Sequence, residues 1–291
     1  MIPPFQQVGL IGKYANRELG EILVQLADFF TARQAQVYLD RATAELLSHP
    51  IEGVEVVERD TLGARCDVAV VVGGDGTLLN AARSLVDHQT PLIGINTGRL
   101  GFLVDISPER MLEKLEEIME GRAVTDERLL LQSCVLREGE EIGRCIAFND
   151  VVVHKAVDPR MLEFEVRIDG HFVNRQRADG VILATPTGST AYALSCGGPI
   201  LQPGQESLVL APICPHTLSQ RPVIIPARSR VEVVISEQGH GNAQVTCDGQ
   251  IALALENGDR VVVEPYHRRI RLIHPQDYNY YAVLRAKLGW G

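Results

Sequence analysis

The stretch Val68–Leu79, with the sequence VAVVVGGDGTLL, decides how the first part of this chain folds. Its first five residues are all apolar, as in a strand of a parallel sheet that helices cover on both faces. The glycines of the following GGDG permit a tight turn, and the apolar residues from Leu78 onward begin a helix. The stretch therefore predicts a strand, a loop at its carboxyl end and a helix, which is where ligands bind in open α/β sheets.

Short apolar runs alternate with helical patterns on both sides of this stretch. They are Val8–Gly12, Glu18–Phe30, Val37–Leu39, Leu78–Val86 and Leu92–Ile95. This alternation predicts a parallel α/β sheet, and we assign residues 1–105 to an N-terminal α/β domain. A charged helix at Pro108–Glu120 follows, bounded by its proline and by a glycine after its end, and we expect it to bridge two domains.

The pattern then changes to strands separated by turn signals, and we assign residues 106–274 to a C-terminal β-rich domain with the form of a sandwich. A hairpin turn is predicted at Asp169-Gly170, because glycine accepts positive φ. A helix at Tyr278–Leu288 is expected to pack back on the first domain, which residues from about 275 to 291 complete. The predicted strands are Leu129–Leu136, Ile146–His154, Phe164–Ile168, Val181–Ala184, Val223–Ile225, Val231–Ile235, Val245–Thr246 and Val261–Val263.

Composition excludes several classes of protein. The chain of 291 residues has a net charge of -9 and no Lys/Arg run, which argues against a general nucleic-acid binder. It has no signal-peptide pattern at its start and no uninterrupted apolar stretch of membrane-spanning length, so we expect neither secretion nor a membrane span. The cysteines form no CxxC pair, and we expect reduced thiols in a cytosol. They are Cys66, Cys134, Cys145, Cys196, Cys214 and Cys247.

The GGDG loop is suited to a polyphosphate, because glycines let phosphates approach main-chain N–H groups at the start of a helix. Asp75 within it is unexpected beside phosphates, since its carboxylate repels them unless it takes up a proton or holds a metal ion. Alternatively, Asp75 caps the helix in an ordinary turn. The chain lacks GxxxxGK[ST], and this loop lacks GxGxxG.

Three further stretches carry polar residues beside predicted strands. The loop Asn96–Leu103 (NTGRLGFL) follows the strand PLIGI and lines the same edge of the sheet as GGDG. Asn149-Asp150 can accept hydrogen bonds from the vicinal hydroxyls of a ribose, although this pair is also common in turns. In Asp179–Ile200, hydroxyls of TPTGST precede a short helix and can clasp phosphate or adenine; alternatively, Thr187 or Ser189 caps that helix.

Taken together, GGDGT, NTGRLGFL, FNDVVVH, DGVILATPTGSTAYALSCGGPI and TCDGQ resemble the NAD kinase family, in this order and over nearly the whole chain. Diacylglycerol and sphingosine kinases share GGDGT, and phosphofructokinases share it more loosely, whereas TPTGSTAYALSCGGP selects NAD kinases among them. The resemblance implies an N-terminal Rossmann-like domain, a C-terminal β-sandwich-like domain, NAD bound between them, and assembly into a homodimer or homotetramer.

The resemblance also implies roles for individual residues. Asp75 corresponds to the general base, acting with Mg²⁺ and ATP. Asn149 and Asp150 correspond to the ribose-binding pair, which is Asn-Glu in many relatives, so the carboxylate here reaches about one methylene less far. The other residues that it places at the substrate or nucleotide are Gly74, Gly76, Arg160, Arg177, Asp179, Thr187, Thr190, Ala191, Tyr192, Ala193, Leu194, Ser195 and Gln250.

The implied activity is transfer of the γ-phosphate of ATP to the 2′-hydroxyl of the adenosine ribose of NAD, in the cytoplasm, without nucleic-acid or membrane partners. One alternative is a lipid or sphingoid-type kinase, which the acidic charge and the polar TPTGST loop disfavour. A second is a non-catalytic NAD-sensing module, which Asp75 disfavours. A dehydrogenase is weaker still, because it needs a GxGxxG turn. Cys196 is expected to be a small packing residue rather than an activated thiolate.

Overall fold

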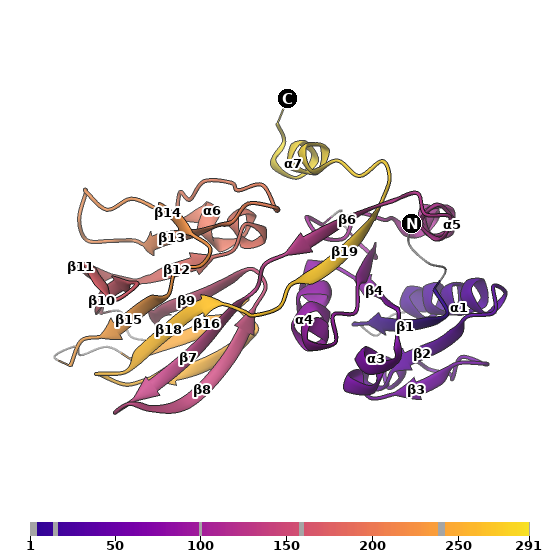
Figure 1. Ribbon diagram of the computed structural model, residues 1–291, viewed down its shortest axis with the longest axis horizontal. Coiled ribbons are helices and arrows are strands. Elements are labelled where there is room, and N and C mark those ends of the chain that lie inside the picture. The colour runs from indigo at the N-terminus through magenta and orange to yellow at the C-terminus, as the bar shows by residue number, and fades with distance from the viewer. Residues whose placement is uncertain (1–4, 14–16, 99–100, 157–159, 238–241, 291) are drawn as a thin grey trace. The chain divides into compact units, whose positions relative to one another are not determined.

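The computed structural model describes residues 5–13, 17–98, 101–156, 160–237 and 242–290. The chain divides into two compact units, one formed by Met1–Glu127 with Ile270–Gly291 and the other by Arg128–Arg269. The first unit contains both the indigo start and the yellow end of the chain in Figure 1. The last segment of the chain therefore returns to the unit in which the chain begins.

The first unit is built on a seven-stranded sheet with the order β3-β2-β1-β4-β5-β19-β6. All the pairings from β3 across to β19 are parallel. The strand order reverses between β1 and β4, which makes the carboxyl ends of these two strands the place where such sheets bind ligands. The strands are β1 (Gln7–Gly12), β2 (Gln36–Asp40), β3 (Glu55–Val57), β4 (Val68–Gly73), β5 (Leu92–Asn96), β6 (Ala123–Arg128) and β19 (Ile270–Pro275).

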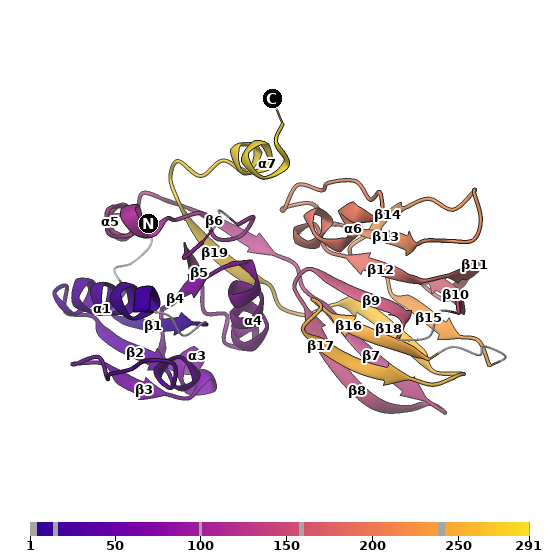
Figure 2. The same ribbon diagram turned by 180° about the vertical axis from the view of Figure 1, so that it is seen from behind.

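Helices cover both faces of this sheet (Figures 1 and 2). Helices α1 and α5 bury apolar side chains in one core with β1, β2 and β4. On the opposite face, Leu62 of α3 packs over Gly9, and Leu78 of α4 packs beside Gly94. The predicted parallel α/β domain is therefore confirmed. Its helices are α1 (Arg17–Thr31), α2 (Arg41–Ala44), α3 (Arg59–Arg65), α4 (Asp75–Leu85), α5 (Met111–Met119) and α7 (Tyr280–Leu288), with 3-10 turns η1 (Val86–His88) and η2 (Pro108–Arg110).

The boundary of this unit lies elsewhere than expected. Helix α5 does not bridge two domains, because Met111, Leu115 and Ile118 are buried in the core of the first unit. Strand β19 joins the first sheet next to β5, although we expected it in the second domain. The C-terminal helix α7 also belongs to the first unit, as predicted, and it buries Val283 and Leu284. Within the described ranges, no helix is long and apolar enough to cross a membrane.

The second unit consists of two six-stranded sheets whose described pairings are antiparallel. One sheet has the order β11-β10-β15-β18-β7-β8, and the other has the order β14-β13-β12-β9-β16-β17. The strands are β7 (Leu131–Arg137), β8 (Glu140–Ala147), β9 (Asp150–Lys155), β10 (Leu162–Ile168), β11 (His171–Ala178), β12 (Gly180–Ala184), β13 (Ser207–Ile213), β14 (Val223–Pro226), β15 (Val231–Ile235), β16 (Ala243–Cys247), β17 (Ile251–Leu255) and β18 (Arg260–Pro265). The turn η3 (Thr187–Thr190) and the helix α6 (Tyr192–Ser195) follow β12.

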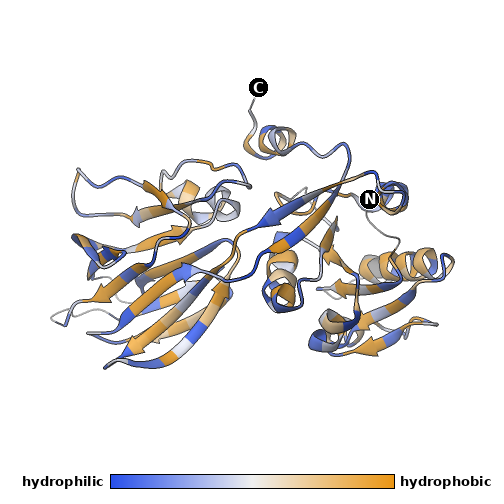
Figure 3. Ribbon diagram, viewed as in Figure 1, coloured by the Kyte–Doolittle hydropathy of each residue, from blue (hydrophilic) through white to orange (hydrophobic). Residues whose placement is uncertain are grey.

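One core lies between these two sheets. Strand β10 alternates buried Leu162, Phe164 and Val166 with more exposed residues, as expected of a strand with one buried face. Figure 3 shows this mixture of hydrophobic and hydrophilic residues along the strands of the unit. The predicted sandwich is confirmed, and the turn at Asp169-Gly170 joins β10 to β11, with positive φ at both residues.

A disulfide joins Cys145 of β8 to Cys247 of β16. These strands belong to opposite sheets, and both cysteines are buried in the shared core. The expectation of six reduced thiols is therefore wrong for this pair. Sequence spacing could not reveal it, because the two residues are 102 positions apart and meet only when the sandwich closes.

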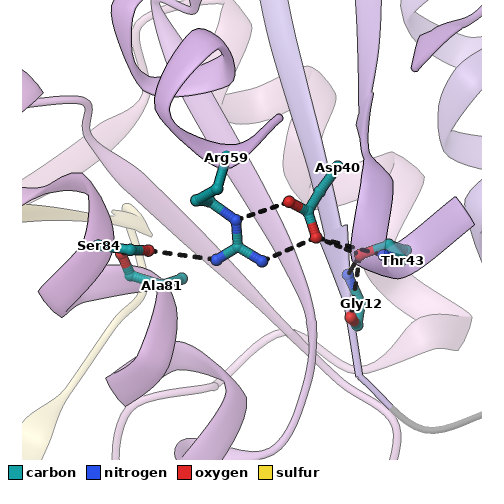
Figure 4. Close-up of polar contacts among 6 residues, drawn as sticks. All are labelled: Gly12, Asp40, Thr43, Arg59, Ala81 and Ser84. Atoms are coloured by element: carbon teal, nitrogen blue, oxygen red, sulfur yellow. Dashed lines mark hydrogen bonds and ion pairs between the residues drawn. The ribbon is translucent and has the colours of Figure 1, made fainter. Parts of the chain in front are cut away.

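An ion pair between the half-buried Arg59 and the buried Asp40 ties helix α4 to the amino-terminal half of the sheet (Figure 4). The guanidinium of Arg59 donates to both carboxylate oxygens of Asp40, at 2.9 and 2.8 Å, and to the hydroxyl of Ser84 on α4, at 3.2 Å. The hydroxyl of Thr43 donates to Asp40 at 3.1 Å and accepts from the backbone N–H of Gly12 at 2.9 Å. The carboxyl ends of β1 and β2 are thus fixed to the helix that follows GGDG.

We predict that Arg59→Ala lowers the free energy of unfolding by about 3 kcal/mol, because it leaves the buried carboxylate of Asp40 without its cation. Arg65→Ala on the same helix removes an exposed pair with Glu55 and should cost at most about 1 kcal/mol. Urea denaturation of both variants measures the difference. Equal losses would contradict the importance of the pair between Arg59 and Asp40.

Candidate functional site

The GGDG loop of the first unit holds the carboxylate of Asp75 between backbone N–H groups. Gly74 is the N-cap of α4, and Asp75 is the first residue of that helix. Oδ2 of Asp75 accepts from the backbone N–H of Phe102 at 2.9 Å, and Oδ1 accepts from that of Leu103 at 3.0 Å. Gly74 rather than Asp75 occupies the N-cap position of α4, and the carboxylate of Asp75 binds the loop after β5, so the alternative of a simple capping residue is wrong.

The loops after β4 and β5 meet at this carboxylate, as expected of two loops at one sheet edge. The backbone N–H of Thr97 donates to the carbonyl of Gly73 at 3.4 Å. Gly101 packs so closely on Asp75 that a Cβ atom there would lie 2.1 Å from Oδ1. Arg99 and Leu100 lie outside the described residues.

The start of α4 also presents groups that suit an anion. The first backbone N–H groups of a helix lack intrahelical partners, and they carry a partial positive charge. The hydroxyl of Thr77 is buried and has no hydrogen-bond partner within the part of the chain that the structure describes. This end of the helix therefore combines one carboxylate with donors for phosphate oxygens.

In the second unit, Asn149 and Asp150 lie at the start of β9, where their backbone is held by Asp248. The N–H groups of Phe148, Asn149 and Asp150 all donate to this one carboxylate, over distances of 2.7 to 3.2 Å. The backbone N–H of Asp248 donates in return to the carbonyl of Asp150 at 2.9 Å. The short segment thus has a fixed conformation.

The side chain of Asp150 is only 5% exposed. Burial, and secondarily the negative charge of Asp248, raise the pKa of Asp150 to about 7. At neutral pH this carboxyl group is therefore a mixture of its acid and its anion. It can donate a hydrogen bond as well as accept one.

The TPTGST loop packs directly against this segment. The hydroxyl of Thr185 donates to the carbonyl of Phe148 at 2.7 Å and accepts from the backbone N–H of Gly188 at 3.1 Å. A Cβ atom at Gly188 would lie 2.0 Å from the carbonyl oxygen of Asn149, so this approach requires glycine. The two motifs, separate in sequence, therefore form one structural element.

Neither Thr187 nor Ser189 caps a helix, contrary to the alternative given above. The hydroxyl of Thr187 accepts from the guanidinium of Arg128 at 3.2 Å. The hydroxyl of Ser189 donates to the carbonyl of Pro186 at 2.6 Å and accepts from the backbone N–H of Leu201 at 2.9 Å. Both hydroxyls instead stabilise the loop.

The other predicted residues of this unit differ in their surroundings. Asp179 forms an ion pair with Lys155 at 2.7 Å, at the start of β12. Arg177 on β11 is exposed, and its carbonyl accepts from the backbone N–H of His216 at 2.9 Å. Gln250 is exposed in the turn between β16 and β17, and Arg160 is exposed just before β10.

The residues that follow TPTGST form the short helix α6 and its approach. Tyr192 is 45% exposed, and Ala193 is buried in a small core with β12 and β13. Cys196 packs against the same core, and burial raises the pKa of its thiol, in agreement with a packing residue. The remaining predicted residues in this stretch are the buried or half-buried Thr190, Ala191 and Leu194 and the exposed Ser195.

Sequence reasoning missed two residues that shape this part of the molecule: Arg128 and Asp248. Asp248 lies in TCDGQ, and the Asp-Gly pair there is a recognisable turn signal. Thr185 is among the TPTGST hydroxyls expected to bind phosphate or adenine, and in the structure it joins this loop to Phe148. Arg128 is 2% exposed, and no local signal marks a buried arginine in a charged stretch.

Family models match most of the chain. The model of the ATP-NAD kinase N-terminal domain matches residues 8–123, and the model of the ATP-NAD kinase C-terminal domain matches residues 148–275. The NAD kinase of Nitrosococcus oceani is 48% identical over 291 residues, which cover 100% of this chain and 99% of that protein. The NAD kinase of Pseudomonas entomophila (strain L48) is 46% identical over 287 residues, which cover 99% and 96%.

Solved structures with similar folds are also enzymes of this kind. The crystal structure of yeast NADH kinase complexed with NADH has a TM-score of 0.87 and 28% identity, and it covers 99% of this chain and 89% of that chain. An NAD kinase from Archaeoglobus fulgidus in complex with ATP has a TM-score of 0.76 over 98% of this chain and 100% of its own. At 24% identity, the second likeness concerns the fold alone.

We predict that the raised pKa of Asp150 makes stability depend on pH. The folded protein favours the protonated form of Asp150. The free energy of unfolding therefore falls as pH rises from about 4 through about 7, because over this range the unfolded chain loses the proton and the folded protein still holds it. Relative to Asp150→Asn, the wild type should lose on the order of 3 kcal/mol over this range. Urea denaturation at a series of pH values measures the loss. Asp169→Asn, in an exposed turn, is the control and should show the same pH dependence as the wild type. The prediction is refuted if the free energy of unfolding of Asp150→Asn changes with pH as much as that of the wild type.

Proposed function

Because the chain belongs to the NAD kinase family, we propose that it transfers the γ-phosphate of ATP to the 2′-hydroxyl of the adenosine ribose of NAD, giving NADP. One observation carries the chemical part of this proposal. The carboxylate of Asp75 is held by two backbone N–H groups at the start of α4, at the switch point of a parallel sheet. Transfer of a phosphate to a hydroxyl group needs a base that takes up the hydroxyl proton, and Asp75 lies at a helix start that suits phosphate.

Asp75 acts as the general base in this proposal. The N–H groups of Phe102 and Leu103 orient the carboxylate, and each oxygen keeps a lone pair for the substrate hydroxyl. As the 2′-oxygen attacks the γ-phosphorus in line, its proton passes to Asp75 and the bond to the β-phosphate breaks, releasing ADP. The transfer is direct and needs no covalent intermediate on the protein.

In this proposal the phosphoryl donor is the complex of ATP with Mg²⁺. Magnesium sites are commonly completed by substrate phosphates rather than by protein ligands alone. Within the described residues, no three His, Cys, Asp or Glu side chains are grouped to hold a metal ion. We therefore assign the ion to the ATP phosphates, while the backbone at Gly74 and Gly76 offsets the remaining phosphate charge at the start of α4.

The second unit supplies the groups that recognise NAD. Asn149 and Asp150 hold the ribose hydroxyls, and their rigid backbone supports that role. Asp150 replaces the longer glutamate of many relatives, and we expect no change of substrate. The residues that surround the nicotinamide and adenine in this proposal are Arg177, Asp179, Thr187, Thr190, Ala191, Tyr192, Ala193, Leu194, Ser195 and Gln250, with Arg160 as a further nucleotide contact.

The alternative functions fit these features less well. A lipid or sphingoid-base kinase would share GGDGT, but the curated relatives match the whole chain, including TPTGST. A non-catalytic NAD-sensing module would have no need of the oriented carboxylate of Asp75. A dehydrogenase would need a GxGxxG turn, and NAD is here a substrate rather than a redox cofactor.

We also propose a homodimer or homotetramer. Strands β11 and β14 are end strands of the two sheets of the second unit. They expose Phe172, Val173, Val223 and Ile224 by 44 to 59%. Exposed apolar end strands tend to pair with another chain, which supports assembly of identical copies. A cytoplasmic location stays a prediction that no feature of the structure tests.

We predict that Asp75→Asn lowers turnover by about 10²- to 10⁴-fold, because the general base is lost. NAD affinity should change little, since Asn keeps the size of the side chain. The assay incubates the protein with Mg²⁺, ATP and NAD and measures NADP with an NADP-specific dehydrogenase, while calorimetry measures NAD binding. Equal loss of binding and turnover would indicate a structural role for Asp75 instead.

We predict further that Gly101→Ala lowers turnover by about 10²-fold, because its methyl group would displace the carboxylate of Asp75. Gly98→Ala in the same loop is the matched control, since the nearest atom to a Cβ there, among the described residues beyond its chain neighbours, lies 3.9 Å away. The same NADP assay compares the two variants. If both variants keep wild-type turnover, the position of Asp75 does not depend on this loop.

A further inference from the structure

The carboxylate of Asp248 has an unusual set of partners. Both of its oxygens accept from the backbone N–H of Phe148 at 3.0 Å, and Oδ1 also accepts from those of Asn149 and Asp150, at 2.7 and 3.2 Å. Three consecutive N–H groups thus converge on one anion, as in the backbone concavities called nests. Charge-assisted hydrogen bonds of this kind are about twice as strong as neutral ones.

Asp248 is itself held rigidly in the turn between β16 and β17. It has φ 52°, and Gly249 follows with φ 61°, in the three-residue connection between the paired Cys247 and Ile251. The preceding Cys247 is joined by a disulfide to Cys145 on β8, the strand that leads into Phe148. The carboxylate and the disulfide therefore connect the same two segments of chain.

The side chain of Asp150 is enclosed by few other titratable groups. Asp248 approaches it from the β16–β17 turn, and Tyr192 on α6 interacts with it electrostatically. Its register partner on β12 is Ala184, which is apolar, and Cys247 does not titrate because it forms the disulfide. Among these neighbours, Asp248 is the group whose charge acts on the carboxyl of Asp150.

We propose that Asp248 is a positioning residue for NAD: it fixes the backbone of Asn149 and Asp150, and its carboxylate opposes a second negative charge on the buried Asp150 beside it. The proposal rests on the proposed function, in which Asn149 and Asp150 hold the ribose. A second ionised carboxylate would also repel the phosphates of NAD. NAD affinity should therefore weaken as pH rises through about 7, where Asp150 loses its proton.

The test compares Asp248→Asn with Asp169→Asn. Asparagine tolerates positive φ, so the first variant keeps the turn and removes the charge. Asp169 is a matched control, because it also has φ 52°, precedes a glycine in a hairpin turn, and accepts from the backbone N–H of Arg230 at 2.9 Å. Calorimetry measures NAD binding without ATP, and the coupled assay measures KM for NAD and for ATP.

We expect Asp248→Asn to weaken NAD binding at least about 10-fold and to raise KM for NAD while leaving KM for ATP unchanged. The pH at which NAD affinity falls should move below that of the wild type, because the pKa of Asp150 drops when the neighbouring charge is removed. Asp169→Asn should match the wild type. Unchanged NAD binding in Asp248→Asn, or an equal rise of both KM values, would overturn the proposal.

A further measurement applies even if Asp248→Asn fails to fold. NAD affinity of the wild type should fall near pH 7, and Asp150→Asn should abolish this fall. A wild-type affinity that is constant from pH 6 to about 8 would overturn the proposal. Absence of NADP formation by the wild type would instead reject the proposed function, and binding calorimetry would still judge the role of Asp248.

Discussion

Carboxylates bound by backbone N–H groups fix the candidate site in each unit. In the first unit, Phe102 and Leu103 orient Asp75, and in the second unit Asp248 orients the segment that contains Asp150. Such contacts join loops that are distant in sequence, and one partner in each contact is a backbone N–H group that cannot rotate away. A site built in this way is preorganised, because the groups that must act are already held in place.

This arrangement requires glycine at two positions. Gly101 allows the loop after β5 to reach Asp75, and Gly188 allows TPTGST to lie against the carbonyl of Asn149. A methyl group at either position would occupy the space of a backbone or carboxylate oxygen. The glycines at these two positions therefore serve close packing between loops.

Much of the architecture could be predicted from local sequence. The apolar Val68–Val72 and the glycines after it predicted strand β4 and the start of α4, because burial on both faces leaves a continuous apolar run. The position of β19 could not be predicted, since its residues fit either sheet and only long-range pairing selects the first. The same limit applies to the Cys145–Cys247 disulfide and to Asp248, whose partners lie about a hundred residues away.

The ribose-binding role proposed for the Asn-Asp pair depends on the surroundings of Asp150. Asp150 is buried at the start of β9, beside the carboxylate of Asp248, which accepts hydrogen bonds from backbone N–H groups. Burial and that charge together raise its pKa to about 7, so the group is a hydrogen-bond donor in part of the molecules at neutral pH. In the binding mode proposed above, a ribose hydroxyl accepts a hydrogen bond from the protonated form of Asp150. The surroundings of this carboxyl group, rather than the length of its side chain, therefore decide its protonation state at neutral pH.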